Sequence, residues 1–332
     1  SACPARWRLA SRGVVAAVAL AASLLTLRPP AVAAPSEEPA EIAAPGDADG
    51  PLLRVLGPDG EPFAGAKVRV GEPGRGGADA ALVGETGPDG AIRLPKAARG
   101  GRASVIATAE GFAPAFPVDL TAPDGTMVLR LARDDVPIRG RLVDREGRPV
   151  AGARVVATTI QGHSSGTLEG VLQAFGRPGG PAGSFTFREN VPGPYAVAPT
   201  VSDADGRFVV RGVGRDRTAS LAVSGPGVAI TSIHVAAREM PALELRPPSF
   251  WEERRDTLLH GATFEVALDP GAEVVGTVTD EATGLPVAAA TVARGFARDD
   301  PWGLYSTTTD AEGRYRLEGL SPGPRRREAG AN

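Results

Sequence analysis

Residues 162–166, with the sequence Gly-His-Ser-Ser-Gly, fit the pattern Gly-x-Ser-x-Gly, in which a serine on a sharp turn acts as a nucleophile. The pattern requires a strand before the serine and a helix after it. Here an apolar run at 155–160 precedes the serine, and residues 167–175 have the composition of a short helix. Ser164 is therefore a candidate nucleophile for ester hydrolysis.

A catalytic Ser164 would need a base and an acid to orient that base. Asp203 or Asp205, with His234 or His260, could complete such a triad. Hydrolases of this kind are built on a large, mostly parallel sheet covered by helices, and little else in this chain has a helical pattern. A Gly/Ser turn at the start of a loop explains the same residues, so we expect no enzyme and keep a serine hydrolase as an alternative.

Metal chemistry is not indicated by the spacing of the polar residues. The histidines at 163, 234 and 260 do not form a zinc-binding pattern such as His-Glu-x-x-His. Acidic turns at 203–206 and 310–313 lack the density of acidic residues that a calcium loop has, and turn chemistry accounts for their Asp and Gly. We predict no metal and no cofactor.

Three aromatic residues, Trp251, Trp302 and Tyr305, could form a platform on which a sugar ring stacks. Trp302 and Tyr305 lie close together before a predicted strand, and they are the candidate ligand contacts. The alternative is that these side chains cap the core of a β-sandwich.

The elements that position these residues are organised by a repeat. Its first block reads as a strand, a turn closed by glycine, a proline at a sheet edge and a second strand. Aspartate accepts hydrogen bonds at the start of the turn, glycine tolerates its positive φ, and proline lacks the N–H that an inner strand needs. Copies of this block lie at 56–68, 143–155 and 278–292.

A second block follows in each copy, as a turn that leads into a strand of alternating apolar and polar residues. Its copies lie at 86–94, 202–210 and 309–320. The paired blocks predict an all-β chain of tandem small antiparallel sandwiches, Ig-like or prealbumin-like. We place module 1 at 51–133, module 2 at 134–236, a connector at 237–259 and module 3 at 260–332.

The middle module has an insertion between its two blocks, which are more than twice as far apart as in the other modules. We place this inserted loop at 162–199. Long loops without their own core often carry function, so the loop is a binding candidate. A tolerated surface excursion explains it equally well.

The two blocks resemble the carboxypeptidase regulatory-like family. The resemblance is strongest in the third copy, where it is carried by Gly284, Pro286, Val287, Asp310, Gly313, Tyr315, Leu317, Gly319, Pro322 and Gly323. It is looser in the first copy, and the three copies together cover most of 51–324. The resemblance implies a seven-stranded prealbumin-like sandwich of the carbohydrate-binding-like group, with an accessory or adhesive role.

Two further features of the resemblance bear on function. The zinc peptidase after which the family is named has no matching ligands here. After residue 323 the family has a further strand like 221–223, so we expect the third sandwich to be incomplete. Residues 206–227 and 261–264 look similar to exported multi-module proteins of planctomycete-type bacteria.

The N-terminus reads as a secretory signal. Arginines at 6, 8 and 12 precede an apolar run at 13–27, and small residues at 31–33 offer a cleavage site. We therefore predict a signal peptide at 1–33 and a disordered linker at 34–50. An uncleaved membrane anchor is the alternative. Cleavage would remove Cys3, which is the single cysteine of the chain.

The composition is consistent with an exported β-protein. Gly 43 and Pro 31 disfavour long helices, and the net charge of -3 with interspersed signs predicts no nucleic-acid partner. We expect a periplasmic, cell-surface or secreted protein that acts as a structural, adhesive or carbohydrate/protein-binding module of the cell envelope. Its partner would be a polysaccharide or an envelope protein. Alternatively, it is the accessory region of a larger secreted enzyme whose catalytic domain lies beyond Asn332.

Overall fold

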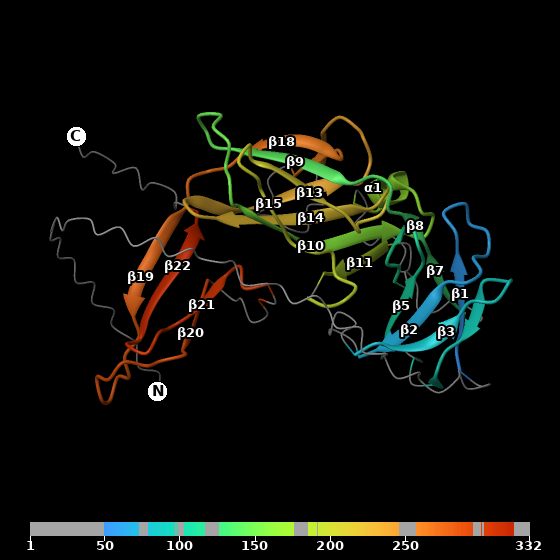
Figure 1. The fold of residues 1–332 in the computed structure, drawn as a ribbon, viewed down its shortest axis with the longest axis horizontal. Coiled ribbons are helices and arrows are strands. Elements are labelled where there is room, and N and C mark those ends of the chain that lie inside the picture. Colours follow the sequence, from blue (N-terminus) through green and yellow to red (C-terminus); the bar gives the residue numbers. More distant parts are fainter. Residues whose placement is uncertain are drawn as a thin grey trace, which may run out of the picture. The chain divides into compact units, whose positions relative to one another are not determined.

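The computed structural model describes residues 50–72, 79–96, 98, 103–116, 126–175, 185–190, 192–245, 257–294, 300 and 302–321. The predicted signal peptide and almost all of the predicted linker, together with Trp251, lie outside these residues. The chain divides into two compact units, 1–38 and 39–332, and the second contains everything described below. Apart from one short helix, the regular structure of the described part consists of β-strands, as predicted (Figure 1).

The first module contains two three-stranded sheets, in the orders β4-β1-β7 and β3-β2-β5, and a small β6–β8 pair. The central strand β1 pairs antiparallel with β4 and parallel with β7. The strands are β1 (Leu52–Leu56), β2 (Lys67–Gly71), β3 (Ala81–Glu85), β4 (Ala91–Arg93), β5 (Ser104–Thr108), β6 (Phe112–Ala113), β7 (Met127–Arg130) and β8 (Ala132–Arg133). Their apolar side chains, including Leu53, Val68 and Leu129, form one core.

The middle module repeats this plan on a larger scale. One sheet has the order β13-β9-β18, and the other has the order β11-β10-β14-β15-β17-β16, with β12 also paired to β10. The strands are β9 (Ile138–Val143), β10 (Arg154–His163), β11 (Phe185–Glu189), β12 (Thr200–Val201), β13 (Arg207–Val210), β14 (Thr218–Gly225), β15 (Val228–Ala236), β16 (Leu243–Leu245), β17 (Thr257–His260) and β18 (Thr263–Ala267). The two sheets face each other in Figure 1 and enclose the largest core of the chain.

The third module is smaller in the described part of the chain. Its strands are β19 (Ala272–Thr277), β20 (Thr291–Ala293), β21 (Ser306–Thr308) and β22 (Arg314–Leu320). β19 pairs with β22 as β1 pairs with β4, and β20 pairs with β21 as β2 pairs with β3. Among the described residues, no strand takes the places that β5 and β7 fill in the first module, and Val275 is 62% exposed.

Two strands lie in a different module from the one that the sequence analysis gives them. β17 falls mostly in the predicted connector, yet it pairs in parallel with β15. β18 falls in the predicted third module, yet it pairs in parallel with β9 over its whole length, from Thr263 opposite Arg139 to Ala267 opposite Val143. The middle module therefore extends to about residue 268, beyond the predicted boundary at 236. Parallel partners so distant in sequence leave no local turn signal, which is why the pattern of turns did not reveal them.

The inserted loop of the middle module has regular structure of its own. The helix α1 (Leu168–Phe175) begins one residue later than predicted. It packs Leu168 and Val171 against Ala236 and Leu259. β11 then returns along β10 as its antiparallel partner. The insertion therefore widens the sheet and covers one of its ends.

A buried hydroxyl joins the two blocks of each module. In the first module, Thr86 Oγ1 accepts a hydrogen bond from the N–H of Ala66 (3.0 Å) and donates one to the carbonyl of Phe63 (2.7 Å). Thr86 is 5% exposed, so without its hydroxyl the N–H of Ala66 and the carbonyl of Phe63 would lack this buried hydrogen-bond partner. The corresponding groups are Ser202 with Ala153 and Val150, and Thr309 with Ala290 and Val287.

The glycine of the second block packs against the strand of the first block. Gly206 has a φ of 75°, and a Cβ placed on it would lie 2.3 Å from the carbonyl oxygen of Leu142 in β9. The carbonyl of Gly206 accepts a hydrogen bond from the N–H of Leu142 (2.8 Å). The same approach recurs at Gly90 against Val55 (2.6 Å) and at Gly313 against Val278 (2.5 Å). The two blocks recur together because each packs directly against the other.

The third module has a strained residue where the other two have glycine. Ala289 has a φ of 56°, whereas the equivalent residues are Gly65 (77°) and Gly152 (74°). In this left-handed conformation a Cβ crowds the following carbonyl. We expect Ala289→Gly to raise the free energy of unfolding of the third module by about 0.5–1 kcal/mol, measured by urea denaturation followed by circular dichroism.

The matched control for this prediction is Gly152→Ala. Nothing lies within 4 Å of a Cβ on Gly152, so the substitution tests the backbone conformation alone. We expect it to lower the stability of the middle module by about 1 kcal/mol. A third module that is weakened by Ala289→Gly would contradict the assignment of strain.

Candidate functional site

A cavity of about 210 Å³ lies where the first module meets the middle module. We call it the arginine cavity, because four arginines line it: Arg130, Arg133, Arg215 and Arg217. Arg130 and Arg133 are the last residues of β7 and β8 in the first module, and Arg215 and Arg217 lie in the turn before β14. The apolar part of the wall is formed by Pro58, Pro114 and Phe116, whereas the nearby Leu131 and Ile160 are buried in the cores of their modules.

Arg217 is half-buried at the centre of this junction. Its Nη1 donates hydrogen bonds to the carbonyls of Pro114 (2.9 Å) and Val213 (3.5 Å), and its Nη2 donates to the carbonyl of Arg130 (3.2 Å). Loss of hydration lowers the pKa of Arg217 to about 10, so the side chain is charged at neutral pH. The carboxylate of Asp134 opposes this effect and raises the pKa of Arg217, although among the described residues no ion pair to Arg217 is found.

Arg130 reaches from the first module across to the turn after β10. Its Nε donates to the carbonyl of Ser164 (3.1 Å) and its Nη1 to the carbonyl of Pro58 (3.2 Å). Gly166 makes room for it, since a Cβ there would lie 2.5 Å from Arg130 Cδ. Among the described residues, the hydrogen-bond partners of Arg130 are thus also carbonyl oxygens, which bind the guanidinium without neutralising its charge.

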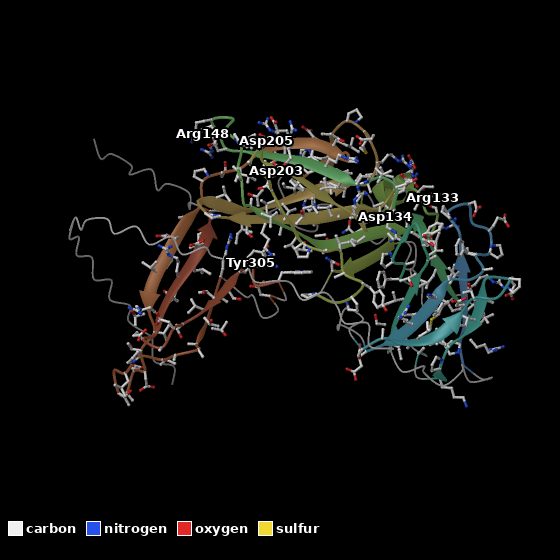
Figure 2. The ribbon with its side chains drawn as sticks, in the orientation of Figure 1. Arg133, Asp134, Arg148, Asp203, Asp205 and Tyr305 are labelled. Atoms are coloured by element: carbon white, nitrogen blue, oxygen red, sulfur yellow. The ribbon has the colours of Figure 1, made fainter. Side chains whose placement is uncertain are left out.

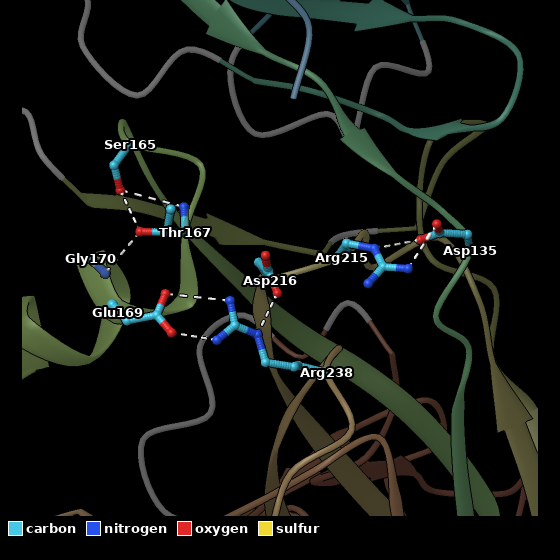
Figure 3. Close-up of polar contacts among 8 residues, drawn as sticks. All are labelled: Asp135, Ser165, Thr167, Glu169, Gly170, Arg215, Asp216 and Arg238. Carbon is cyan, nitrogen blue, oxygen red and sulfur yellow. Dashed lines mark hydrogen bonds and ion pairs between the residues drawn. The ribbon is translucent and has the colours of Figure 1, made fainter. Parts of the chain in front are cut away.

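Two groups of ion pairs lie beside the arginine cavity, one at Arg215 and one at Asp216, and Figure 3 shows both. Arg215 forms a two-point pair with Asp135, with distances of 3.0 and 2.9 Å, and this pair lowers the pKa of Asp135. Arg238 joins Asp216 (2.7 Å) and Glu169, and both contacts raise its pKa. These pairs connect the segment before β9, the turn before β14, the first turn of α1 and the segment after β15. Each of the two arginines has at least one carboxylate partner.

The turn with the Gly-x-Ser-x-Gly pattern forms another part of the cavity wall. Nδ1 of His163 lies 2.7 Å from Ser165 Oγ and accepts a hydrogen bond from the N–H of Ser165 (3.1 Å). Ser165 Oγ in turn contacts Thr167 Oγ1 (2.8 Å), which accepts a bond from the N–H of Gly170 and so caps α1. Burial lowers the pKa of His163. The polar groups of this turn therefore bond one another.

The structure separates the residues that could form a triad with Ser164. Asp203 and Asp205 follow β12, which pairs with the start of β10, whereas Ser164 follows the end of β10. The ten residues of β10 span roughly 30 Å. Figure 2 shows both aspartates beside Arg148, at the opposite end of the middle module from Asp134.

The two candidate histidines are also distant from Ser164. His234 lies on β15 opposite Ser220, which lies opposite Thr159 of β10. Its ring is therefore about 10 Å away across two strand spacings and roughly 16 Å away along the strands. His260 ends β17 and packs against Phe264, with ring centroids 5.0 Å apart. Within the described ranges, no group of three or more His, Cys, Asp or Glu side chains could hold a metal ion.

Trp302 and Tyr305, the predicted ligand contacts, pack with Leu304 on the outer face of the middle module. Leu304 is 7% exposed against Val156 and Ala222, whose side chains point away from the main core. Both aromatic rings are half-buried, and Tyr305 is labelled in Figure 2. The alternative role predicted for them was a cap on a sandwich core, but here they cover a neighbouring sheet. Sugar binding by their remaining surface stays a prediction.

The loop that holds these rings is itself ordered by Asp300. Burial alone would raise the pKa of its carboxyl, but hydrogen bonds from the N–H groups of Leu304 and Tyr305 and from Ser306 Oγ lower it. Arg154 also donates to the carbonyl of Trp302 (2.7 Å). The aromatic pair is thus held from both sides by charged groups.

Asn190 is a buried residue that the sequence analysis did not single out for the site. It is 1% exposed. Its Nδ2 donates to the carbonyls of Ala157 (2.7 Å) and Val197 (3.1 Å), and its Oδ1 accepts from the N–H of Val197 (2.9 Å). Its own carbonyl accepts the indole N–H of Trp302 (2.5 Å). One polar side chain therefore fixes the inserted loop beside the docking point of the third module.

Comparison with known families bears on the third module. Residues 273–331 match the carboxypeptidase regulatory-like domain. This match agrees with the resemblance seen in the repeat and supports a small β-domain there. No curated protein matches the chain.

Several solved structures match part of this chain. The Bacillus anthracis TIE protein matches at 14% identity and a TM-score of 0.20, over 80% of this chain and 42% of that one. The shaft pilin SpaA from Lactobacillus rhamnosus GG matches at 13% and 0.23, over 66% and 96%. The major pilin RrgB from Streptococcus pneumoniae matches at 13% and 0.22, over 68% and 49%. Among the described residues, no helix is long and apolar enough to cross a membrane.

Proposed function

We propose that this chain is a non-catalytic, exported array of β-sandwich modules that serves as a structural or adhesive spacer of the cell envelope. The observation that carries this proposal is the set of polar contacts that fasten each module to the next. A spacer needs such contacts, because modules on free linkers would lose the orientation in which they present their surfaces.

The first junction is fastened by main-chain and charged groups. The N–H of Arg215 donates to the carbonyl of Arg133 (2.7 Å), the last residue of the first module. The N–H of Gly212 donates to Asp134 Oδ1 (2.9 Å) and so holds the first residue of the middle module at the junction. The pair between Arg215 and Asp135 lies beside them, and Arg217 adds its bonds to carbonyls of the first module. Because hydrogen bonds in a network strengthen one another, we expect these contacts together to restrict bending between the two modules.

The second junction combines backbone pairing with the docked loop. The N–H of Ala229 donates to the carbonyl of Asp269 (2.9 Å), and the N–H of Gly271 donates to the carbonyl of Gly227 (2.8 Å). A Cβ on Gly319 of β22 would lie 2.6 Å from Ile230 of β15, so the two modules come into close contact there. The aromatic loop around Trp302 adds a third point of attachment.

The partner we propose is an envelope polysaccharide or an envelope protein, held by weak contacts that multiply along the array. The net charge of -3 favours neither nucleic acid nor an acidic surface. Export is supported by the basic and apolar pattern at the N-terminus. The absence of catalysis is part of the proposal, and an esterase assay tests it: ester turnover that Ser164→Ala abolishes would overturn it.

The stiffness of the first junction can be measured with two spin labels. Glu85→Cys and Glu244→Cys place exposed labels in the first and middle modules, and Cys3→Ser removes the native thiol. We expect a narrow distribution of distances between the labels, which broadens when Asp135→Ala and Arg217→Gln are added. A distribution that is already broad without these substitutions would overturn the spacer proposal.

The control for that experiment is Arg148→Ala. Its side chain is 72% exposed and pairs only within its own turn, with Asp144 and Glu146. We therefore expect the label distances to remain unchanged in this variant.

A further inference from the structure

We propose that the arginine cavity binds a small organic acid, with the carboxylate against Arg217 and the apolar body against the wall formed by Pro58, Pro114 and Phe116. This is a binding activity beyond the proposed structural role. It rests on the charge balance of the cavity, on the space next to Arg217 and on the apolar character of the wall.

The charges of the cavity do not cancel. Arg215 is neutralised by Asp135, and Asp216 is neutralised by Arg238. Arg130, Arg133 and Arg217 remain; Arg133 is exposed, and the hydrogen-bond partners of the other two among the described residues are all carbonyl oxygens. Carbonyl dipoles solvate a guanidinium but leave its net charge, and Asp134 acts on Arg217 without forming an ion pair with it. A charge removed from water with no counterion in contact is destabilised. An anion in the cavity would remove that destabilisation.

Arg217 still has donors to offer. A guanidinium has five N–H groups, and the recorded bonds of Arg217 all come from its Nη atoms. Within the described part of the chain, no acceptor is bonded to its Nε. A carboxylate that approaches along the edge of the guanidinium would accept this N–H together with one from Nη2, in the two-point geometry that arginine favours.

Gly162 leaves the space that such a carboxylate would need. It lies on β10 and lines the cavity. A Cβ placed on it would lie 3.6 Å from Arg217 Cγ and 3.7 Å from Arg217 Nε, and these two atoms would be its nearest neighbours. The missing side chain therefore keeps one face of Arg217 open toward the cavity.

The wall selects an organic acid over an inorganic anion. Pro58, Pro114 and Phe116 offer apolar surface, and a phosphate ion would leave that surface in contact with water. The volume of about 210 Å³ lies below the usual range of drug-sized sites. The ligand is therefore small, about the size of one ring with one carboxylate. Because both modules line the cavity, the ligand would bridge them.

Three probes test the proposal on the full chain: benzoate, its neutral isostere benzamide, and inorganic phosphate. We expect benzoate to bind saturably in isothermal titration and to raise the melting temperature. Benzamide and phosphate should each bind at least about tenfold more weakly, since each lacks one of the two complementary features. Equal binding of benzamide, or equal binding of phosphate, would overturn the proposal, and so would no binding of benzoate at millimolar concentration.

Two variants locate the site. Gly162→Val fills the space beside Arg217 without removing any hydrogen bond, and valine suits a strand. We expect it to keep the melting temperature and to lose benzoate binding. Arg217→Gln should also lose binding, and Arg148→Ala should keep it. Benzoate binding that is unchanged in folded Gly162→Val would show that the ligand sits elsewhere and would refute the proposal.

Discussion

Replacement of Gly206 by alanine is expected to lower the free energy of unfolding of the middle module by about 3 kcal/mol or more. Two separate effects contribute. The φ of 75° is unfavourable for alanine, and the new Cβ would lie 2.3 Å from the carbonyl oxygen of Leu142. That carbonyl accepts the N–H of Val150 (3.0 Å), so a displacement of β9 would also strain the turn that leads into the second strand of the block. Urea denaturation followed by circular dichroism measures the loss.

Gly147→Ala is the matched control for this prediction. Gly147 also has a positive φ, 80°, but nothing lies within 4 Å of a Cβ placed on it. We expect Gly147→Ala to lower the free energy of unfolding by about 1 kcal/mol, because it changes only the preferred backbone conformation. Equal losses of stability for the two substitutions would mean that the steric contact with β9 does not contribute to the effect of Gly206→Ala. The same ranking should hold in the first module, with Gly90→Ala more harmful than Gly65→Ala.

The second large effect is expected for Asn190→Ala. The substitution removes three hydrogen bonds from a side chain that is 1% exposed. It leaves the carbonyls of Ala157 and Val197 and the N–H of Val197 without that partner in a buried site. Because each unsatisfied buried group costs about 1–3 kcal/mol, a total loss of about 3–5 kcal/mol is expected. Denaturation by urea again provides the measurement.

The fluorescence of Trp302 distinguishes a local displacement around residue 190 from a general loss of stability. The indole N–H of Trp302 donates to the carbonyl of Asn190, so displacement of this segment should shift the emission of Trp302 to longer wavelength before the module unfolds. Val201→Ala serves as the control, because Val201 is 58% exposed and its truncation should change stability by less than about 0.5 kcal/mol. An Asn190→Ala protein as stable as this control would contradict the assigned role.

Much of the fold could be predicted from the sequence, because the turns are encoded locally. Asp144 accepts hydrogen bonds from the N–H groups of Glu146 and Arg148, and Gly147 adopts the positive φ that its place in the turn requires. Both features depend on a few adjacent residues. The short helix α1 was predictable for the same reason. The partners of β17 and β18 were not, since alternation of apolar residues tells which face is buried but not which distant strand lies alongside.

The candidate site was less accessible to sequence reasoning. Arg217 and Arg130 are 87 positions apart and have no motif in common. Arginine also supplies nearly all the positive charge of the chain, so the few that line a cavity do not stand out. Asn190 lies in a stretch rich in glycine and proline, where a single amide has no periodic context. Trp302 was noticed because tryptophan is rare here, yet its contacts depend on packing between modules.

The parallel pairing of β18 with β9 has a consequence for biogenesis. Arg141 and Glu265, an ion pair across these strands, are 124 positions apart. A chain that leaves a ribosome or an export channel from its N-terminus would expose the free edge of β9 until residue 267 has emerged. The middle module would therefore complete its folding late, after the first module has closed. A chaperone that covers unpaired strands would have its longest contact at this edge.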